Sequence, residues 1–343
     1  MIMHKDVLDI DAPAEIERIV RWMRTSMAGL RRTGVILGIS GGVDSSVCLA
    51  LCVRAFGPER VVTLLMPEKD SDPESESLAR MLAAHYGVTP VLEGITPALD
   101  GYGCYRRRDE AIARVFPEFD AAAGYTAKIG LPPGLLDEGT LNFFFLTIIT
   151  PDGRELKARL KPADFSQIVS ASNFKQRTRS AMLYYHAELR NYAVIGTPNK
   201  NEHDQGFFVK HGDGGVDLSP VMHLYKTQIY QLATALGVPE LILQRPPTSD
   251  TYSAPSTQEE FFFRLPFHQL DLLWFAHEHR CSPEETAQAL ELTPLQVSRA
   301  FADFDRKRRS TEYLRTAPLS MVGLGGPIVA GGAQSIDPLQ SVR

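Results

Sequence analysis

A short apolar segment that runs into a glycine turn and then a second apolar segment most strongly limits the folds open to this chain. Residues 34–39 have the length and composition of a buried parallel strand. The turn that follows reads Ser-Gly-Gly-Val-Asp-Ser, and a helix is expected from about 46 to 56. The pattern then repeats, with expected strand, helix and strand at 61–66, 77–86 and 88–92. This alternation predicts a doubly wound α/β fold, with a parallel sheet and helices on both faces.

The remaining chain has an interrupted middle and a helical end. Residues 140–149 and 154–160 flank a Pro-Asp-Gly turn and predict a β-hairpin, within an insert at about 120–170. Further helices are expected at 14–32, 179–190, 227–236, 267–279, 282–291 and 293–308. We therefore predict three parts: a main domain over 1–260, a helical C-terminal cap over 261–315 and a Gly-rich tail over 316–343.

Composition and charge exclude several classes of protein. Hydrophobic residues make up 44% and charged residues 22%, and the net charge of −5 provides no general attraction for nucleic acid or an anionic membrane. No run of about 18 apolar residues is present, and the first residues carry acids where a signal peptide needs a basic region. The four cysteines include no CxxC pair. We expect a cytoplasmic protein without a disulfide, and without membrane or nucleic-acid partners.

The Ser-Gly-Gly-Val-Asp-Ser turn has the composition of a phosphate-binding loop. Gly41 and Gly42 let the backbone approach a phosphate, and Ser40 and Ser45 add hydroxyl donors at a helix N-terminus. No Lys follows, so it is not a Walker A loop. Asp44 would repel a polyphosphate unless Mg²⁺ lies between them. The structural alternative is a glycine turn whose Asp and Ser only cap the helix.

This turn resembles the pyrophosphate loop of the N-type ATP pyrophosphatases, and later segments resemble one family in that group, the ammonia-dependent NAD synthetases. The similar segments are NFKQRTR at 173–179, IGTPNKNE at 195–202, GFFVKHGDGGVD at 206–217, LYKTQ at 224–228 and PTSD at 247–250. The resemblance covers about 14–99 and 170–310. It implies an adenine nucleotide alpha-hydrolase-like fold and a homodimer.

The resemblance also implies a role for individual residues. Asp44 and Glu202 would hold Mg²⁺, and Asp213 would accept a proton from ammonium. Asp44 and Lys226 would be catalytic. ATP would be bound by Gly38, Ser40, Gly41, Gly42, Ser45, Met66, Thr197, Lys226 and Thr248. Deamido-NAD would be oriented by Arg177, Lys210 and Asp217, with Lys307 reaching a partner subunit's substrate.

The implied reaction is the ATP-dependent amidation of deamido-NAD by ammonia through an acyl-adenylate, giving NAD, AMP and pyrophosphate. Residues 251–263 lack the acidic, glycine-containing pattern of the family, and Arg306 stands where the family often has His. An amide-forming paralogue that adenylates a different carboxylic acid is therefore the alternative. Residues 1–33 are too short for the glutaminase domain of glutamine-using relatives, so we expect ammonia as the nitrogen donor.

A helix-turn-helix with a basic end is the other interpretation of 282–308, and it would indicate DNA binding. The acidic net charge of the chain argues against it.

Overall fold

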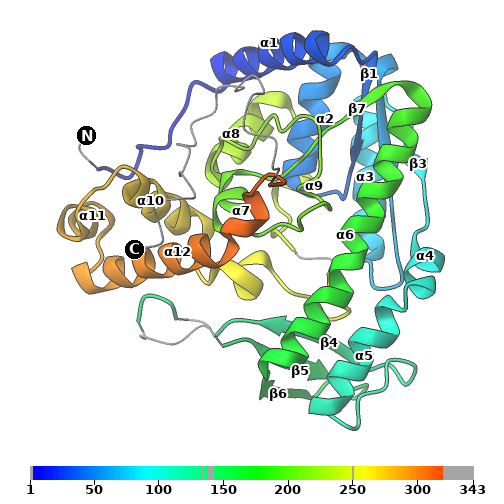
Figure 1. The fold of residues 1–343 in the computed structure, drawn as a ribbon. Helices are drawn as coiled ribbons and strands as arrows, with labels where there is room; N and C mark the ends of the chain where they lie inside the picture. The colour runs from blue at the N-terminus through cyan, green and yellow to red at the C-terminus, as the bar shows by residue number, and fades with distance from the viewer. Residues whose placement is uncertain (1–2, 133, 138–142, 249–250, 320–343) are drawn as a thin grey trace.

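A four-stranded parallel sheet forms the centre of the computed structural model, which describes residues 3–132, 134–137, 143–248 and 251–319 (Figure 1). Its strand order is β3-β2-β1-β7, and all three pairs are parallel. The strands are β1 (Gly34–Gly38), β2 (Val61–Leu65), β3 (Val91–Leu92) and β7 (Tyr192–Val194). The non-consecutive neighbours β1 and β7 confirm the predicted doubly wound arrangement.

Helices cover both faces of this sheet, because successive residues of a strand point to opposite sides. Val35 and Leu37 of β1 pack in a cluster with α1, α2, α3 and α8, whereas Ile36 packs in a cluster with α4, α5 and α6. The helices are α1 (Ala12–Leu30), α2 (Val43–Phe56), α3 (Pro73–His85), α4 (Thr96–Gly101), α5 (Cys104–Val115), α6 (Pro162–Arg190), α7 (Lys200–Gln205), α8 (Lys226–Leu236), α9 (Glu240–Leu243), α10 (Phe267–Glu278), α11 (Pro283–Leu290) and α12 (Pro294–Arg315), with the short turns η1 (Pro58–Arg60) and η2 (Glu259–Phe263).

Two helix boundaries differ from the sequence-based expectation in ways that matter for function. Helix α2 begins at Val43, because Gly42 is its N-cap, so Asp44 lies in its first turn. Helix α6 begins far before the expected residue 179. The buried side of α6 includes polar residues such as Lys175 and Ser172, and these hide the apolar periodicity by which an amphipathic helix is recognised.

The predicted hairpin is part of a separate antiparallel sheet of three strands. Its order is β4-β5-β6, with β4 (Thr126–Gly130), β5 (Phe145–Ile149) and β6 (Glu155–Arg159). Strands β5 and β6 confirm the hairpin, although residues 140–142 of its expected first strand lie outside the described residues. Strand β4 was not predicted. Leu146 and Ile148 pack this sheet against Ile112 of α5 and Ile168 of α6.

Helices α10, α11 and α12 pack around Trp274 and Phe304, both fully buried, and contact the rest of the fold through α7 and α8. Most of the expected Gly-rich tail, 320–343, lies outside the described residues. The division into three parts stays a prediction. In the described part of the chain, no helix is both long and apolar enough to cross a membrane. All four cysteines are free.

Gly41 sets how closely the glycine turn approaches helix α3. Its φ is +73°, and a Cβ built on it would lie 2.8 Å from Leu78 Cβ and 2.9 Å from Ser75 O. Both the left-handed backbone and the close approach require glycine.

We expect Gly41→Ala to lower the free energy of unfolding by about 1 to 3 kcal/mol, because alanine is strained at this φ and collides with α3. Chemical denaturation measures the change. Gly29→Ala is the matched control: no atom lies within 4 Å of its added Cβ, and alanine favours the helix by about 0.5 to 1 kcal/mol. Equal stability of the Gly41 and Gly29 variants would contradict this account.

Candidate active site

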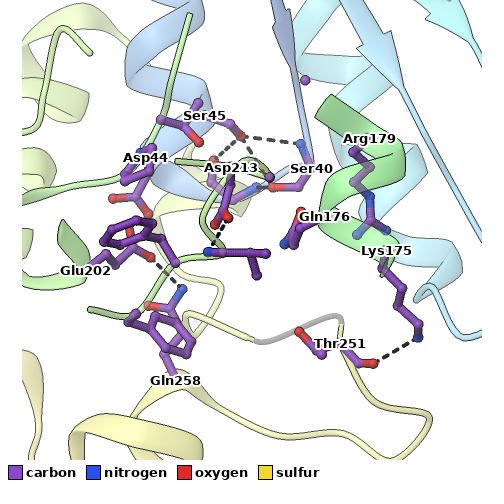
Figure 2. A pocket seen from close by; sticks show the side chains of 18 of the residues that line it. Ser40, Asp44, Ser45, Lys175, Gln176, Arg179, Glu202, Asp213, Thr251 and Gln258 are labelled. Atoms are coloured by element: carbon purple, nitrogen blue, oxygen red, sulfur yellow. Dashed lines mark hydrogen bonds between the residues drawn. The ribbon is translucent and has the colours of Figure 1, made fainter. Parts of the chain in front are cut away.

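A cavity of about 810 Å³ opens where β1, β2 and β7 end at their carboxyl edge. This is where ligands bind in open α/β sheets. The predicted residues that line it are Gly38, Ser40, Gly42, Asp44, Ser45, Met66, Arg177, Thr197, Glu202, Lys210, Asp213, Lys226 and Thr248. Figure 2 shows the glycine turn on one side of the cavity and Gln258 and Thr251 on the other. Residues far apart in the sequence thus meet in one site.

The glycine turn leaves the N-terminus of α2 available to an anion. The N-cap residue is Gly42, so no N-cap side chain occupies the first backbone amides of α2. Ser45 Oγ donates to Gly42 O at 2.9 Å and lies 3.5 Å from Ser40 Oγ, so neither bond caps a helix amide. Asp44 turns away to Lys226 and Asn199. The alternative in which Asp and Ser only cap the helix is therefore wrong.

Asp44, Glu202 and Lys226 form a charge cluster in which Lys226 is fully buried and the two acids are half-buried, and Asn199 hydrogen-bonds to both acids. Lys226 Nζ forms an ion pair with Asp44 Oδ2, and Asn199 Nδ2 donates to Asp44 Oδ1 at 3.0 Å. Glu202 Oε2 accepts from the Asn199 amide at 3.0 Å, as part of a capping box at the start of α7. The short helix α7 thus brings Glu202 near Asp44, which lies in the first turn of α2.

The electrostatics of this cluster favour a cation. Burial, with the nearby Asp44 carboxylate, raises the pKa of Glu202 to about 8, although Lys226 acts in the opposite direction. Burial lowers the pKa of Lys226, but Asp44 and Glu202 outweigh it, so its net shift is upward. Two carboxylates and one ammonium leave an excess of negative charge when ionised.

The donor set fits Mg²⁺. Carboxylate oxygens are hard ligands, and Mg²⁺ is held by one or two carboxylates together with phosphate oxygens. Among the described residues, no group of three or more His, Cys, Asp or Glu side chains could form a metal site of protein ligands alone. Asp44 and Glu202 would therefore share an ion with a bound phosphate.

The GFFVKHGDGGVD loop forms the wall beside α6. Arg177 Nε donates to Lys210 O at 3.3 Å, and Lys210 Nζ donates to Tyr313 O and Thr316 O, both at 2.8 Å. Lys210 thus ties this loop to the end of α12. Asp213 Oδ1 accepts from Val209 N at 2.7 Å. Burial raises the pKa of Asp213 to about 6, although hydrogen bonds from backbone amides, including that of Val209, act to lower it.

Three predicted site residues do not line the cavity: Gly41, Asp217 and Lys307. Asp217 Oδ2 accepts from Val194 N at 2.8 Å and braces β7. Lys307 is buried, pairs with Asp303 at 2.9 Å and donates to Phe262 O at 2.8 Å. Burial also lowers the pKa of Lys307. In this structure both side chains are engaged by the protein itself.

Three residues that support the site were not predicted from the sequence: Asn199, Lys175 and Gln258. The Asn-x-x-Glu spacing of Asn199 and Glu202 is typical of a capping box, and this signal could have indicated a role for Asn199. Lys175 Nζ lies 2.9 Å from Glu68 Oε1 and 2.7 Å from Asp70 Oδ2, and donates to Thr251 O at 2.9 Å. These partners are distant in sequence, so no local pattern reveals them.

Known proteins resemble this chain in both sequence and structure. The family model described as NAD synthase matches residues 15–113 and 145–318. The chain is 47% identical over 318 residues to an NH(3)-dependent NAD(+) synthetase of Rhizobium meliloti (strain 1021), covering 93% of this chain and 94% of that relative. It is 48% identical over 320 residues to the enzyme of the same name from Mesorhizobium japonicum, covering 93% and 99%.

Among solved structures, an NH3-dependent NAD synthetase from Campylobacter jejuni is similar with a TM-score of 0.59. The alignment covers 91% of this chain and 100% of that chain, at 21% sequence identity. This likeness concerns the fold alone, and it agrees with the predicted adenine nucleotide alpha-hydrolase-like architecture.

The raised pKa of Glu202 predicts a carboxylate that destabilises the metal-free protein. Because the folded-state pKa of about 8 lies above the reference value of 4.5, stability falls as pH rises from about 4.5 through about 8. Glu202→Gln removes this titration and keeps an acceptor for Asn199. Relative to wild type, we expect its free energy of unfolding to gain on the order of 1 to 3 kcal/mol between pH 5 and pH 8.

Denaturation in chelator at both pH values measures the effect. Glu118→Gln, at an exposed position, is the control and should show no such pH dependence. A Glu202→Gln variant that parallels wild type at both pH values would contradict the assignment.

Proposed function

The chain belongs to the NAD synthase family, and from that premise we propose that it amidates deamido-NAD with ammonia at the expense of ATP. The reaction passes through an acyl-adenylate and gives NAD, AMP and pyrophosphate. The observation that carries the proposal is the half-buried cluster of Asp44, Glu202 and Lys226 beside a glycine turn at the carboxyl end of β1. The two relatives that are 47% and 48% identical favour deamido-NAD over a different carboxylic acid.

The proposed mechanism assigns charge neutralisation to the glycine-turn side of the cavity. Attack of the substrate carboxylate on the α-phosphate releases pyrophosphate, and the developing negative charge needs stabilisation. Lys226 and the free amides at the start of α2 supply it, with the Ser40 and Ser45 hydroxyls as further donors. Met66 and Thr197 line the same side and would contact the nucleoside.

Asp44 and Glu202 would hold Mg²⁺ in this mechanism. When bound, the ion supplies Lewis-acid neutralisation of the phosphate oxygens. Ionised Glu202 is the form that binds a cation, and Asn199 fixes both carboxylates for it.

The proposed substrate side consists of Arg177, Asp213 and the loop that Lys210 holds. Arg177 is exposed and lines the cavity, and within the described ranges its side chain makes one hydrogen bond, the long one to Lys210 O, so its guanidinium is available to an anionic substrate. Asp213, with a pKa of about 6, is mostly ionised at neutral pH and would accept a proton from ammonium. Ammonia must be neutral to attack the acyl-adenylate.

We also propose a cytoplasmic homodimer. Tyr185 and Leu189 of α6 are 57% and 66% exposed, which supports an interface on this helix. Four free cysteines are in keeping with a reducing compartment.

Asp44→Asn tests the catalytic cluster. Asparagine keeps an acceptor for Lys226, whereas alanine would leave that ammonium without its ion-pair partner in a buried site. We expect pyrophosphate release to fall by at least about 100-fold, as for loss of a transition-state charge contact, while the variant stays folded at the assay temperature. Asp109→Asn, outside the cavity, serves as the control and should retain full activity. Normal turnover of Asp44→Asn at ordinary Mg²⁺ would refute the role.

The nitrogen donor gives a second test. The purified protein should form NAD with ammonium and leave glutamine untouched, because Cys48, Cys52 and Cys104 are buried and burial raises the pKa of each thiol. A catalytic thiol needs the opposite shift. NAD formation with each donor at equal concentration measures this, and Cys281→Ser should change neither rate. Efficient turnover with glutamine as the sole donor would overturn it.

A further inference from the structure

Residues 251–263, the segment that departs from the family pattern, are fastened to the outer edge of strand β4. Ala127 N donates to Ser253 Oγ at 3.0 Å, and Ala254 N donates to Ala127 O at 3.1 Å. Lys128 Nζ donates to Pro255 O at 3.1 Å. Because β5 occupies the other edge of β4, the segment lies along the open side of the antiparallel sheet.

Side chains strengthen this attachment. Tyr252 is 5% exposed and belongs to the apolar cluster of the β4-β5-β6 sheet, where its ring meets that of Phe261 at 5.4 Å. Gly130 of β4 approaches so closely that an added Cβ would lie 3.1 Å from Glu260 O. At the two ends, Lys175 and Lys307 donate to Thr251 O and Phe262 O. The position of the segment is therefore set by the sheet and by two buried ammonium groups.

The segment brings Gln258 to the charge cluster. Gln258 Nε2 donates to Glu202 Oε1 at 3.2 Å, on the carboxylate oxygen that Asn199 leaves free, and Figure 2 shows the two side chains facing each other. Its backbone amide donates to Pro247 O at 3.0 Å. Gln258 Oε1 is buried without a hydrogen-bond partner in the described ranges. Among the described residues, the Glu202 carboxylate is therefore the hydrogen-bond partner of the Gln258 side chain.

We propose that Gln258 is a positioning residue for Glu202, and that the β4-β5-β6 sheet holds it there through Ala127 and Ser253. Two hydrogen bonds, from Asn199 and from Gln258, fix the two oxygens of the Glu202 carboxylate. Such outer partners set the orientation of a ligating carboxylate. The inference rests on the proposed function only in that Glu202 holds a cation beside bound ATP, and it assigns the insert a role in the active site.

The test uses full-length protein and two measurements. One is the affinity for Mn²⁺ in the presence of a non-hydrolysable ATP analogue, by titration calorimetry. The other is kcat and KM for ATP in pyrophosphate release. Gln258→Met keeps the length of the side chain and removes its donor. We expect about 10-fold weaker Mn²⁺ binding and about 10- to 100-fold lower kcat, with KM for ATP changed less than about threefold.

Matched controls separate positioning from general damage. Gln244, the C-cap residue of α9, also donates its side-chain amide to a glutamate, Glu240, at 2.9 Å, but on the exposed surface, so Gln244→Met should alter neither measurement. Thermal unfolding checks that each variant is folded.

The role of the sheet is tested by Ser253→Ala, which removes the acceptor of the Ala127 amide, against Ser256→Ala, which leaves both bonds to Ala127 in place. Ser253→Ala should weaken Mn²⁺ binding about threefold or more, and adding it to Gln258→Met should have no further effect, because both act through one contact. Additive losses, or a Gln258→Met variant that behaves like Gln244→Met, would overturn the inference.

The Mn²⁺ measurement needs no carboxylate substrate. If wild type forms no NAD from deamido-NAD while Gln258→Met still binds Mn²⁺ more weakly, the proposed function fails and the positioning role stands.

Discussion

Two half-buried carboxyl groups and one buried ammonium meet just beyond the end of β1, and the rest of the site is arranged around them. The Lys226–Asp44 ion pair joins α8 to α2, and Asn199 joins α7 to both carboxylates. Left alone, the cluster keeps the pKa of Glu202 near 8. Such an arrangement lowers the stability of the protein alone. A divalent cation bound together with a polyphosphate would compensate the charge of the two carboxylates.

The two sheets position residues on different sides of the cavity. The parallel sheet delivers the glycine turn, Met66 and Thr197 to one edge, because parallel strands end together. The antiparallel sheet lies on the opposite side of the cavity and carries the 251–263 segment on its open edge. Phe261 and Phe262 of that segment also line the cavity. The β4-β5-β6 sheet thereby supports part of the cavity wall opposite the glycine turn.

Much of this could be predicted from the sequence, and what could not has a physical reason. Strands β1 and β2 are short apolar runs, and a glycine turn follows β1, so the parallel sheet and the place of that turn at its edge were predicted. The long α6 was not, because Lys175 and other polar residues lie on its buried side. Gln258 and the bonds of β4 to Ser253 join residues distant in sequence, and no local periodicity reports such pairs. Lys307 was expected to reach a partner subunit's substrate, whereas its side chain is buried and bonded to Asp303 and Phe262 O, which are partners that a sequence motif does not reveal.

The central claim, that the Glu202 carboxyl is ionised by the arrival of a cation with ATP, can be measured as protons released. Calorimetric titration of the protein with the preformed Mg²⁺ complex of a non-hydrolysable ATP analogue, in buffers of different ionisation enthalpy, counts them. With a pKa of about 8, Glu202 should release about 0.9 proton per site at pH 7. Glu202→Gln should release none. Absence of proton release in wild type, or the same release in Glu202→Gln, would contradict the account.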